Sequence, residues 1–157
     1  VPNLMALDAE VELKSMQGIR TLSLEEFILG NRKTAKKQDE LVSNIFVPHP
    51  GKNAFGNFEK LGTRAYLVIS IVMVGVVAEL NEQDEILNLK VAVGACSPVA
   101  QRLRLLEKEC VGQRLKSIEI HPKHLELLDP IDDVRASANY RNAVVPELLK
   151  RAITGVV

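Results

Sequence analysis

Residues 58–80 read FEKLGTRAYLVISIVMVGVVAEL, and this stretch decides the fold. From Tyr66 to Ala78 almost every residue is apolar, and most are β-branched or small. A transmembrane helix needs about 20 apolar residues, whereas this run is shorter and has charges close to both ends. A β-branched run that contains Gly75 instead predicts a strand over residues 66–78 that is buried on both faces.

Two cations, Lys60 and Arg64, lie just before this run, where the predicted strand would emerge from the core. Such a basic pair would suit an anion or the polar edge of a cofactor. The alternative is two solvated cations at the end of a strand, and residue types alone favour this second reading.

Composition restricts the class of protein. The chain has 157 residues, of which 46% are hydrophobic, and equal numbers of acidic and basic residues give it no net charge. We therefore expect a buried core and neither a nucleic-acid nor a membrane partner. The spacing of Cys96 and Cys110 fits neither a metal site nor a disulfide framework, which indicates a reducing, cytoplasmic compartment. The sequence starts at Val1 instead of Met, and its first residues do not resemble a signal peptide. We expect that an N-terminal part has been cut away.

Before the central run, patterning predicts strands separated by polar connections. The expected elements are a strand at 10–13, a turn at 14–20, a returning strand at 21–24, a helix at 24–29, a polar loop at 31–39 and a strand at 40–47. Ser23 can cap the short helix, which Gly30 would end. Pro48 and the Pro- and Gly-containing stretch 49–57 then predict a domain boundary, which divides the chain into residues 1–52 and 53–157.

After the central run, a polar turn at 81–85 and an apolar run at 86–95 predict an antiparallel partner strand. The pair Ser97-Pro98 predicts the start of a helix that buries Leu103, Leu106 and Cys110 and stops at Gly112. Further helical segments are expected at 124–128 and from about residue 136 to the end, with a kink or split at Pro146. The predicted fold class is α+β: an antiparallel sheet with helices on one side.

Residue patterns identify no nucleophile–base pair and no phosphate-binding loop. His121 and His124 could share a helix face, but Pro122 lies between them and no third ligand is evident, which argues against zinc. The adjacent carboxylates Asp132 and Asp133 are better explained as helix caps than as a general-acid pair. The basic stretch NRKTAKK at 31–37 could bind a diphosphate or could only keep the surface soluble.

Three stretches resemble a known family. They are LMALDAEVEL (4–13) with RTLSLEEFILGNRKTAKKQDELVSNIFVP (20–48), FEKLGTRAYLVISIVMVGVV (58–77) and PIDDVRASANYRNAVVPELLKRAI (130–153). In this order they resemble the FAD-binding medium subunit of the molybdenum hydroxylases, such as xanthine dehydrogenase and carbon monoxide dehydrogenase. The resemblance implies that residues 1–52 are the C-terminal part of an α+β FAD-binding domain and that residues 53–157 are the flavoprotein C-terminal domain.

The resemblance also implies cofactor-binding residues. Leu41 and Val42 match positions that approach the flavin, Lys60 matches a lysine that reaches the flavin ring system, and Arg32 matches an arginine near the cofactor. The two glycine-rich segments that hold the FAD pyrophosphate in this family are absent, so residues 1–157 alone are expected to bind FAD poorly and to be inactive. Acidic residues that some members carry over the flavin are replaced by Ala65–Val68.

By the same resemblance, the intact enzyme would oxidise a purine, xanthine-type or other N-heterocyclic substrate at a molybdopterin centre. Electrons would pass through [2Fe-2S] clusters in an iron–sulfur subunit to FAD, and then to NAD or another acceptor. The molybdopterin would lie in a further partner subunit. The alternative is a non-catalytic module that docks the other subunits and has no FAD of its own.

Overall fold

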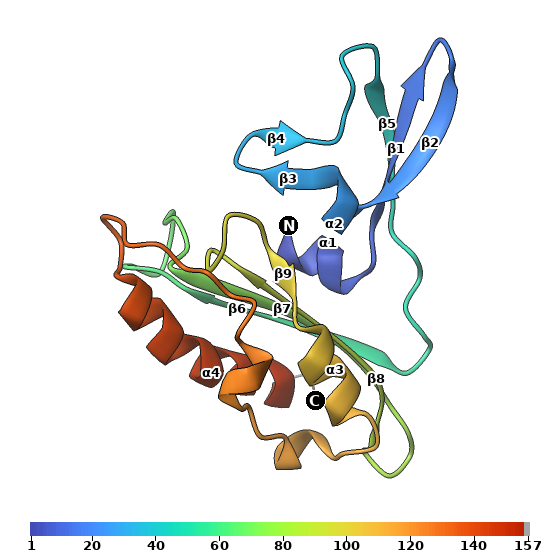
Figure 1. Cartoon of the computed structure of the whole chain (residues 1–157). Coiled ribbons are helices and arrows are strands. Elements are labelled where there is room, and N and C mark those ends of the chain that lie inside the picture. The colour runs from blue at the N-terminus through green and yellow to red at the C-terminus, as the bar shows by residue number, and fades with distance from the viewer. Residues whose placement is uncertain (156–157) are drawn as a thin grey trace.

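The computed structural model describes residues 1–155 and contains three antiparallel sheets and a small number of helices (Figure 1). The strands are β1 (Glu10–Ser15), β2 (Gly18–Ser23), β3 (Ile28–Gly30), β4 (Lys33–Thr34), β5 (Leu41–Phe46), β6 (Ala54–Leu61), β7 (Val72–Leu80), β8 (Ile86–Gly94) and β9 (Gln101–Arg102). The α-helices are α1 (Pro2–Ala6), α2 (Leu24–Phe27), α3 (Arg104–Cys110) and α4 (Ala138–Thr154), and the 3-10 helices are η1 (Leu115–Ser117) and η2 (Pro122–His124). No helix within these residues is both long and apolar enough to cross a lipid bilayer.

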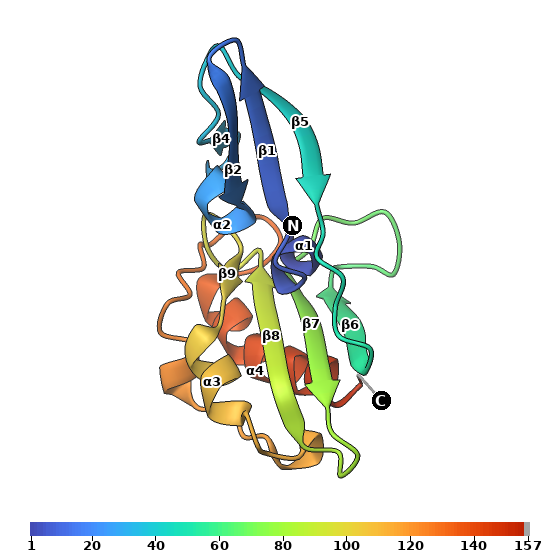
Figure 2. The same cartoon turned by 90° about the vertical axis from the view of Figure 1, so that its right-hand side faces the viewer.

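The main sheet is a meander in the order β6-β7-β8-β9, in which each strand pairs antiparallel with the next. Helices α3 and α4 cover one face of this sheet, whereas α1 from the N-terminal part of the chain lies on the other (Figures 1 and 2). The remaining strands form a smaller sheet in the order β2-β1-β5 and the β3–β4 hairpin. These features confirm the predicted α+β class, with the helices of the C-terminal part on one side of an antiparallel sheet.

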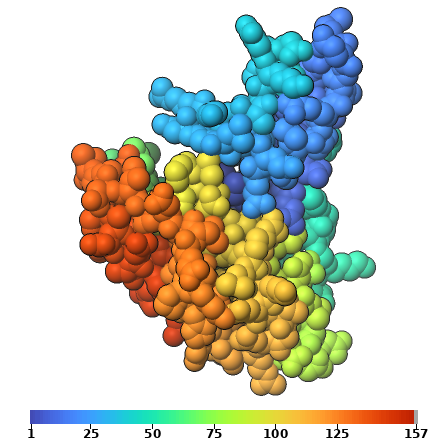
Figure 3. All heavy atoms as spheres, in the orientation of Figure 1, coloured from blue at the N-terminus to red at the C-terminus, as the bar shows by residue number. Residues whose placement is uncertain are grey.

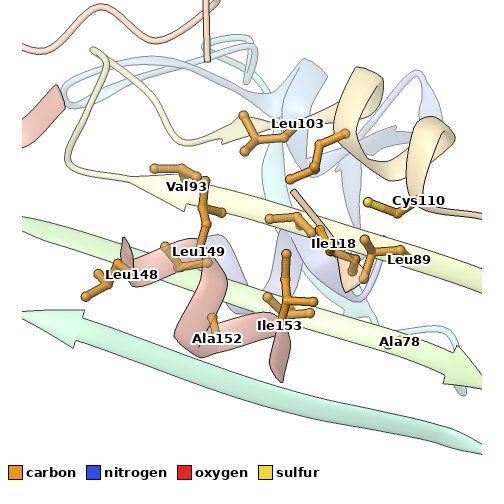
Figure 4. Close-up of a cluster of buried hydrophobic side chains, with 14 of the residues drawn as sticks. Ala78, Leu89, Val93, Leu103, Cys110, Ile118, Leu148, Leu149, Ala152 and Ile153 are labelled. Atoms are coloured by element: carbon orange, nitrogen blue, oxygen red, sulfur yellow. The ribbon is translucent and has the colours of Figure 1, made fainter. Parts of the chain in front are cut away.

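The principal core lies between the main sheet and helices α3 and α4 (Figure 4). Alternate residues of β7 and β8 point into it and meet the apolar face of α4. Its labelled members in Figure 4 are Ala78, Leu89, Val93, Leu103, Cys110, Ile118, Leu148, Leu149, Ala152 and Ile153. The other face of β7 and β8 carries a second, smaller core that receives α1, so both faces of β7 are buried.

The prediction of one buried strand over residues 66–78 is correct only from Val72 onward. Tyr66 and Leu67 lie in an irregular connection and are 82% and 93% exposed. Residues 58–61 belong to β6, which pairs antiparallel with β7. The chain must therefore reverse direction between these two strands, and residues 62–71 make that reversal despite their β-favouring composition.

The prediction of a helix from Ser97 is also wrong. Residues 95–99 form bends, β9 follows, and α3 begins only at Arg104. The Ser97 hydroxyl donates to the carbonyl of Cys96 and accepts the amide of Asp129, so it is not free to cap a helix. The helix ends at Cys110 with Val111 as its C-cap, Gly112 (φ +80°) follows this cap, and the expected buried face of α3 is confirmed.

The helical segment expected at 124–128 is wrong, because residues 125–127 form a turn after the 3-10 helix η2. Two other predicted helices form with shifted ends. The cap at Ser23 is confirmed as a capping box with Glu26, but α2 ends at Phe27 rather than residue 29, because Ile28 already has extended geometry and enters β3. Helix α4 begins at Ala138 with Ser137 as its cap. It is not split at Pro146, because residues before and after the proline, such as Val145 and Leu149, are anchored in the same core.

Of the two carboxylates before α4, Asp132 acts as the capping hypothesis predicts, whereas Asp133 binds the turn that precedes the helix. Asp132 accepts the backbone amide of Ala138, and Asp133 accepts the amides of Arg135 and Ala136. Both carboxylates are therefore occupied by structural hydrogen bonds.

Candidate functional site

A groove runs beside α1 on the face of the main sheet opposite α3 and α4. Its volume is about 300 Å³. It is lined by Asn3, Leu7, Gly56, Asn57, Phe58, Gly75, Val76 and Val77. The wall is therefore α1 with the residue that follows it, and the floor is formed by β6 and β7. This volume is at the lower end of the range for small-molecule pockets.

Two glycines allow α1 to lie close to the sheet. A Cβ atom on Gly75 would come within 2.8 Å of Oδ1 and 3.1 Å of the backbone N of Asn3, and one on Gly94 would come within 2.7 Å of Pro2. Glycine inside a strand often marks such a close backbone approach. Gly75 was visible in the sequence, but nothing local indicated which segment would lie against it.

A buried ion cluster fastens the end of α1 to the C-terminal part of the chain. Arg102 is 3% exposed and forms a two-point ion pair with Glu107, with distances of 2.6 and 3.0 Å. Its Nη1 also donates to the carbonyl of Met5 and to the carboxylate of Asp8, which in addition pairs with Lys90. The sequence did not predict this cluster, because its members are far apart along the chain.

Lys60 lies on the groove side of β6. Phe58 pairs with Gly75 and Lys60 with Met73, so both side chains are on the face that carries α1, about 7 Å apart along the strand. The Lys60 ammonium donates to the carbonyl of Val68 at 2.8 Å. Lys60 therefore lies inside strand β6, not in front of a strand as expected, and its side chain contacts the connection between β6 and β7.

Leu41 and Val42 lie at the start of β5, the edge strand of the small sheet. Their side chains are 74% and 45% exposed, and all six residues of β5 are exposed. β5 leads through the linker into β6 (Figure 2), but Leu41 and Val42 lie at the end of β5 that is away from this linker, and as neighbours in a strand their side chains point to opposite faces. An edge strand with exposed apolar residues is suited to contact with another group or segment.

Arg32 is not brought together with these residues. It occupies the turn of the β3–β4 hairpin with φ +55°. This hairpin lies on the opposite side of β1 from β5 (Figure 2) and overhangs an open notch above the C-terminal part of the chain (Figure 3). The basic stretch 31–37 is thus divided between this hairpin and the loop that follows it, where Lys36 donates to the carbonyl of Glu40.

The remaining reactive residues have structural roles. His124 is buried, accepts the amide of His121 at Nδ1, and therefore donates from Nε2 to Glu109. Hydrogen bonds from His124 and Lys123 lower the pKa of Glu109 to about 2. Burial raises the pKa of the Cys96 and Cys110 thiols to about 11, which leaves both unreactive. No cluster suitable for a metal ion occurs among residues 1–155.

Comparison with known proteins assigns the chain to a family. Residues 58–156 match the CO dehydrogenase flavoprotein C-terminal domain. The chain belongs to this flavoprotein family. Residues 1–50 match the FAD binding domain in molybdopterin dehydrogenase, so the two matches occur in the order that the sequence resemblance predicted. Membership of the molybdenum hydroxylase flavoproteins is thereby confirmed.

Curated relatives of this flavoprotein chain include the medium subunit of nicotine 6-hydroxylase from Paenarthrobacter nicotinovorans, 27% identical over 160 residues. That alignment covers 96% of the chain and 53% of the relative. The carbon monoxide dehydrogenase medium chain of Hydrogenophaga pseudoflava is 24% identical over 158 residues, which are 95% of the chain and 52% of the relative. The chain thus spans about half the length of the curated relatives it matches.

Solved structures show the same fold. The reconstituted CO dehydrogenase of Oligotropha carboxidovorans superimposes with a TM-score of 0.85 at 22% identity, over 99% of this chain and 55% of that one. Quinoline 2-oxidoreductase from Pseudomonas putida 86 gives a TM-score of 0.82 at 21% identity, over 99% and 54% of the two chains.

Proposed function

We propose that this chain forms one wall of the FAD site in the flavoprotein subunit of a molybdopterin-dependent hydroxylase. The observation that carries the proposal is the pair of family matches, in which an FAD-binding segment is followed directly by the flavoprotein C-terminal domain. The groove beside α1 and the exposed residues of β5 supply a surface for it.

The residues present fit part of the cofactor. Phe58, Leu41 and Val42 offer exposed apolar surface to a flat ring, and Lys60 adds one cation at its edge. The groove of about 300 Å³ is too small for a whole FAD molecule. The residues that line it also provide no run of backbone amides of the kind that holds a diphosphate. We therefore assign residues 1–157 to the flavin ring and not to the pyrophosphate.

The bound flavin would supply the transfer of electrons between redox partners. The side chains of Leu41 and Val42 point to opposite faces of β5, so one of them would pack on the ring and the other would approach it through its backbone. Lys60 would stabilise negative charge that accumulates on the ring, since an ammonium near an anion lowers its energy most where water is partly excluded. Arg32, on the distant β3–β4 hairpin, would contact only an outlying part of the cofactor.

The wider assembly follows from the same proposal. An iron–sulfur subunit with [2Fe-2S] clusters would deliver electrons from a molybdopterin subunit, and NAD or another acceptor would remove them. The oxidised substrate would be a purine, xanthine-type or other N-heterocyclic compound. We place the complex in the cytoplasm, in keeping with the unpaired buried thiols of Cys96 and Cys110. The division into residues 1–52 and 53–157 remains part of this proposal.

A second candidate function is a docking module without its own FAD. The observation that favours it is β5, whose six residues are all exposed although four of them are apolar. Such an edge could be covered by another subunit instead of by a cofactor and its binding domain.

Calorimetric titration with FAD separates the two functions. We expect one-to-one binding by the full-length gene product and weak or no binding by residues 1–157. The control is FMN, which has the same ring but lacks the adenosine phosphate half of FAD, and should bind the gene product more weakly. A gene product that binds no flavin, alone or in its purified complex, would overturn the proposal and favour the docking module.

A further inference from the structure

Arg141 is a buried cation that no function described above uses. It lies in the first turn of α4 and is 1% exposed. Its Nη1 donates to the carbonyls of Ile71 and Ala95, the second at 2.9 Å, and its Nη2 donates to Asp133 Oδ1 at 2.7 Å. A planar guanidinium carries five donors in a fixed fork, so it can bridge three acceptors in one fixed geometry.

These three partners come from three different connections at one end of the main sheet. Ile71 ends the connection between β6 and β7, Ala95 directly follows β8 with φ +67°, and Asp133 precedes α4. Arg141 therefore joins segments that are up to 70 residues apart in the chain. Figure 1 shows these connections meeting at the end of the sheet where α4 begins.

The connection between β6 and β7, residues 62–71, is the one that contacts Lys60. It projects sideways from the sheet (Figure 2) and is closed at its base by the hydrogen bond from the Ile71 amide to the Leu61 carbonyl. The Val68 carbonyl within it receives the Lys60 ammonium at 2.8 Å. Val68 also packs directly over Gly62, where a Cβ atom would overlap its side chain. The connection thus has a defined shape that directs the Lys60 side chain.

Stability alone is a weak explanation for Arg141. Its Nε–H group is buried and has no hydrogen-bond partner among residues 1–155. Leaving such a donor unpaired costs free energy, and an apolar side chain of similar volume would pack at the same place without that cost. An arginine at this point is better explained by the need to hold several backbone segments in one arrangement.

We propose that Arg141 is a positioning residue for Lys60. By holding the Ile71 carbonyl, it fixes the shape of residues 62–71, and the Val68 carbonyl of that connection then directs the Lys60 ammonium. The effect of this positioning on a flavin rests on the proposed function. The positioning of Lys60 by Arg141 does not, because all the residues involved belong to this chain.

The direct test is the rate at which Lys60 is acylated by an amine-reactive ester, measured by mass spectrometry on residues 1–157. Lys33 is the internal reference, because it is an exposed residue of β4. In Arg141→Gln we expect Lys60 to react about 2- to 10-fold faster relative to Lys33, which is the ratio expected for losing one hydrogen bond. Gly62→Ala should give the same increase, and it disturbs the connection without changing the core.

Arg135→Gln is the matched control. Arg135 also pairs with Asp133, at 2.7 Å, but it contacts neither Ile71 nor Ala95. We expect this variant to leave the Lys60 rate unchanged. Equal rates in folded Arg141→Gln and wild type, or an equal rise in Arg135→Gln, would overturn the proposal. If Arg141→Gln does not fold, the Gly62→Ala variant decides: an unchanged acylation rate of Lys60 in that variant would overturn the proposal.

The flavin-loaded gene product shows separately whether this positioning matters. Arg141→Gln should lower the flavin reduction potential when residue 60 is lysine, and should cause no further change in a Lys60→Ala background, because coupled residues are not additive. An equal shift in both backgrounds would overturn the positioning role. If Lys60→Ala itself leaves the potential unchanged, the flavin role of Lys60 fails, whereas the acylation rates still decide whether Arg141 positions it.

Discussion

Nη1 of Arg102 lies 2.5 Å from Oδ1 of Asp8, although 94 residues separate them in the chain. Asp8 belongs to the segment that matches an FAD-binding domain, and Arg102 belongs to the flavoprotein C-terminal domain. Partial burial would by itself raise the pKa of Asp8, but hydrogen bonds from Lys90 and Arg102 outweigh it and hold this pKa below its usual value. The two parts of the chain are therefore joined by a charged contact as well as by the packing of α1.

Replacing Arg102 should strongly destabilise the chain. Arg102→Met would leave the buried Glu107 carboxylate without its two-point partner, and we expect a loss of about 3–5 kcal/mol of unfolding free energy. Arg151→Gln is the control, because Arg151 pairs with Glu147 at the surface and should contribute less than about 1 kcal/mol. Urea denaturation monitored by circular dichroism measures both values. Similar losses in the two variants would show that the buried cluster is unimportant.

Substitution of Gly75 should displace α1 from the sheet. Gly75→Ala places a Cβ atom 2.8 Å from Asn3 Oδ1, and overpacking of this kind costs about 1–3 kcal/mol. Gly56→Ala is a matched control in the neighbouring strand, since its Cβ would meet only the Val76 carbonyl at an ordinary 3.6 Å. Denaturant unfolding of both variants provides the comparison. The prediction is refuted by a Gly75→Ala chain as stable as Gly56→Ala.

The pair Arg20–Glu40 predicts a loss of stability in acid. Hydrogen bonds from Arg20, and then from the Lys37 amide, lower the pKa of Glu40 to about 2. This pKa lies below the usual value of about 4.3 for a glutamate. The stability that the Arg20–Glu40 pair contributes is therefore complete above about pH 4.3 and is lost as the pH falls towards about 2. The melting temperature of wild type should therefore be higher than that of Glu40→Gln at about pH 6, and the two melting temperatures should converge near about pH 2. A difference that does not change with pH would contradict this assignment.

Lys60→Ala should lower the flavin reduction potential of the full-length gene product. A cation within about 4–6 Å of the ring stabilises the reduced form by roughly 1–2 kcal/mol, which is about 20–40 mV for a two-electron couple. Lys60→Arg should give a smaller shift, because it keeps the charge but misplaces it. Potentiometric titration of wild type and both variants measures the shifts. Equal potentials in all three would leave Lys60 as a solvated cation on β6.

Residues 53–157 should fold without residues 1–52 if the predicted domain boundary is correct. The shorter chain exposes Val77 and Ala92 and removes two partners of Arg102, so its unfolding free energy should fall by about 2 kcal/mol or more. Denaturation of both chains, followed by circular dichroism, measures the difference. A shorter chain that shows no cooperative unfolding would place the boundary elsewhere.

Much of the local structure could be predicted from contiguous residues. The β-branched run around Gly75 predicted a buried strand, and Ser23 predicted a helix start, because strand burial and capping depend on neighbouring side chains. The same reasoning failed at Ser97, where a local start signal was overridden by hydrogen bonds to Cys96 and Asp129. It also failed at Tyr66, whose β-favouring type says nothing about where the chain must turn back.

The candidate site was less predictable than the fold. The resemblance pointed to Lys60, Leu41, Val42 and Arg32. The structure places Lys60 on the groove side of β6, whereas Leu41 and Val42 lie in β5 and Arg32 lies in the β3–β4 hairpin. Their contact with a flavin stays a prediction. The groove itself and the residues that shape it, such as Asn3, could not be derived from spacing, because they become neighbours only after α1 has docked.

The sequence by itself determined the α+β class and the antiparallel pair β7–β8, because these depend on composition and on periodicity within short segments. It also determined the family, through the resemblance of three contiguous stretches. Only the tertiary structure decided that α1 lies against Gly75, that Arg102 joins Asp8 to Glu107, and that Arg141 gathers three connections. A buried charge or a close backbone approach is stable only where partners from distant parts of the chain meet it, and the identity of those partners is set by packing and not by sequence distance.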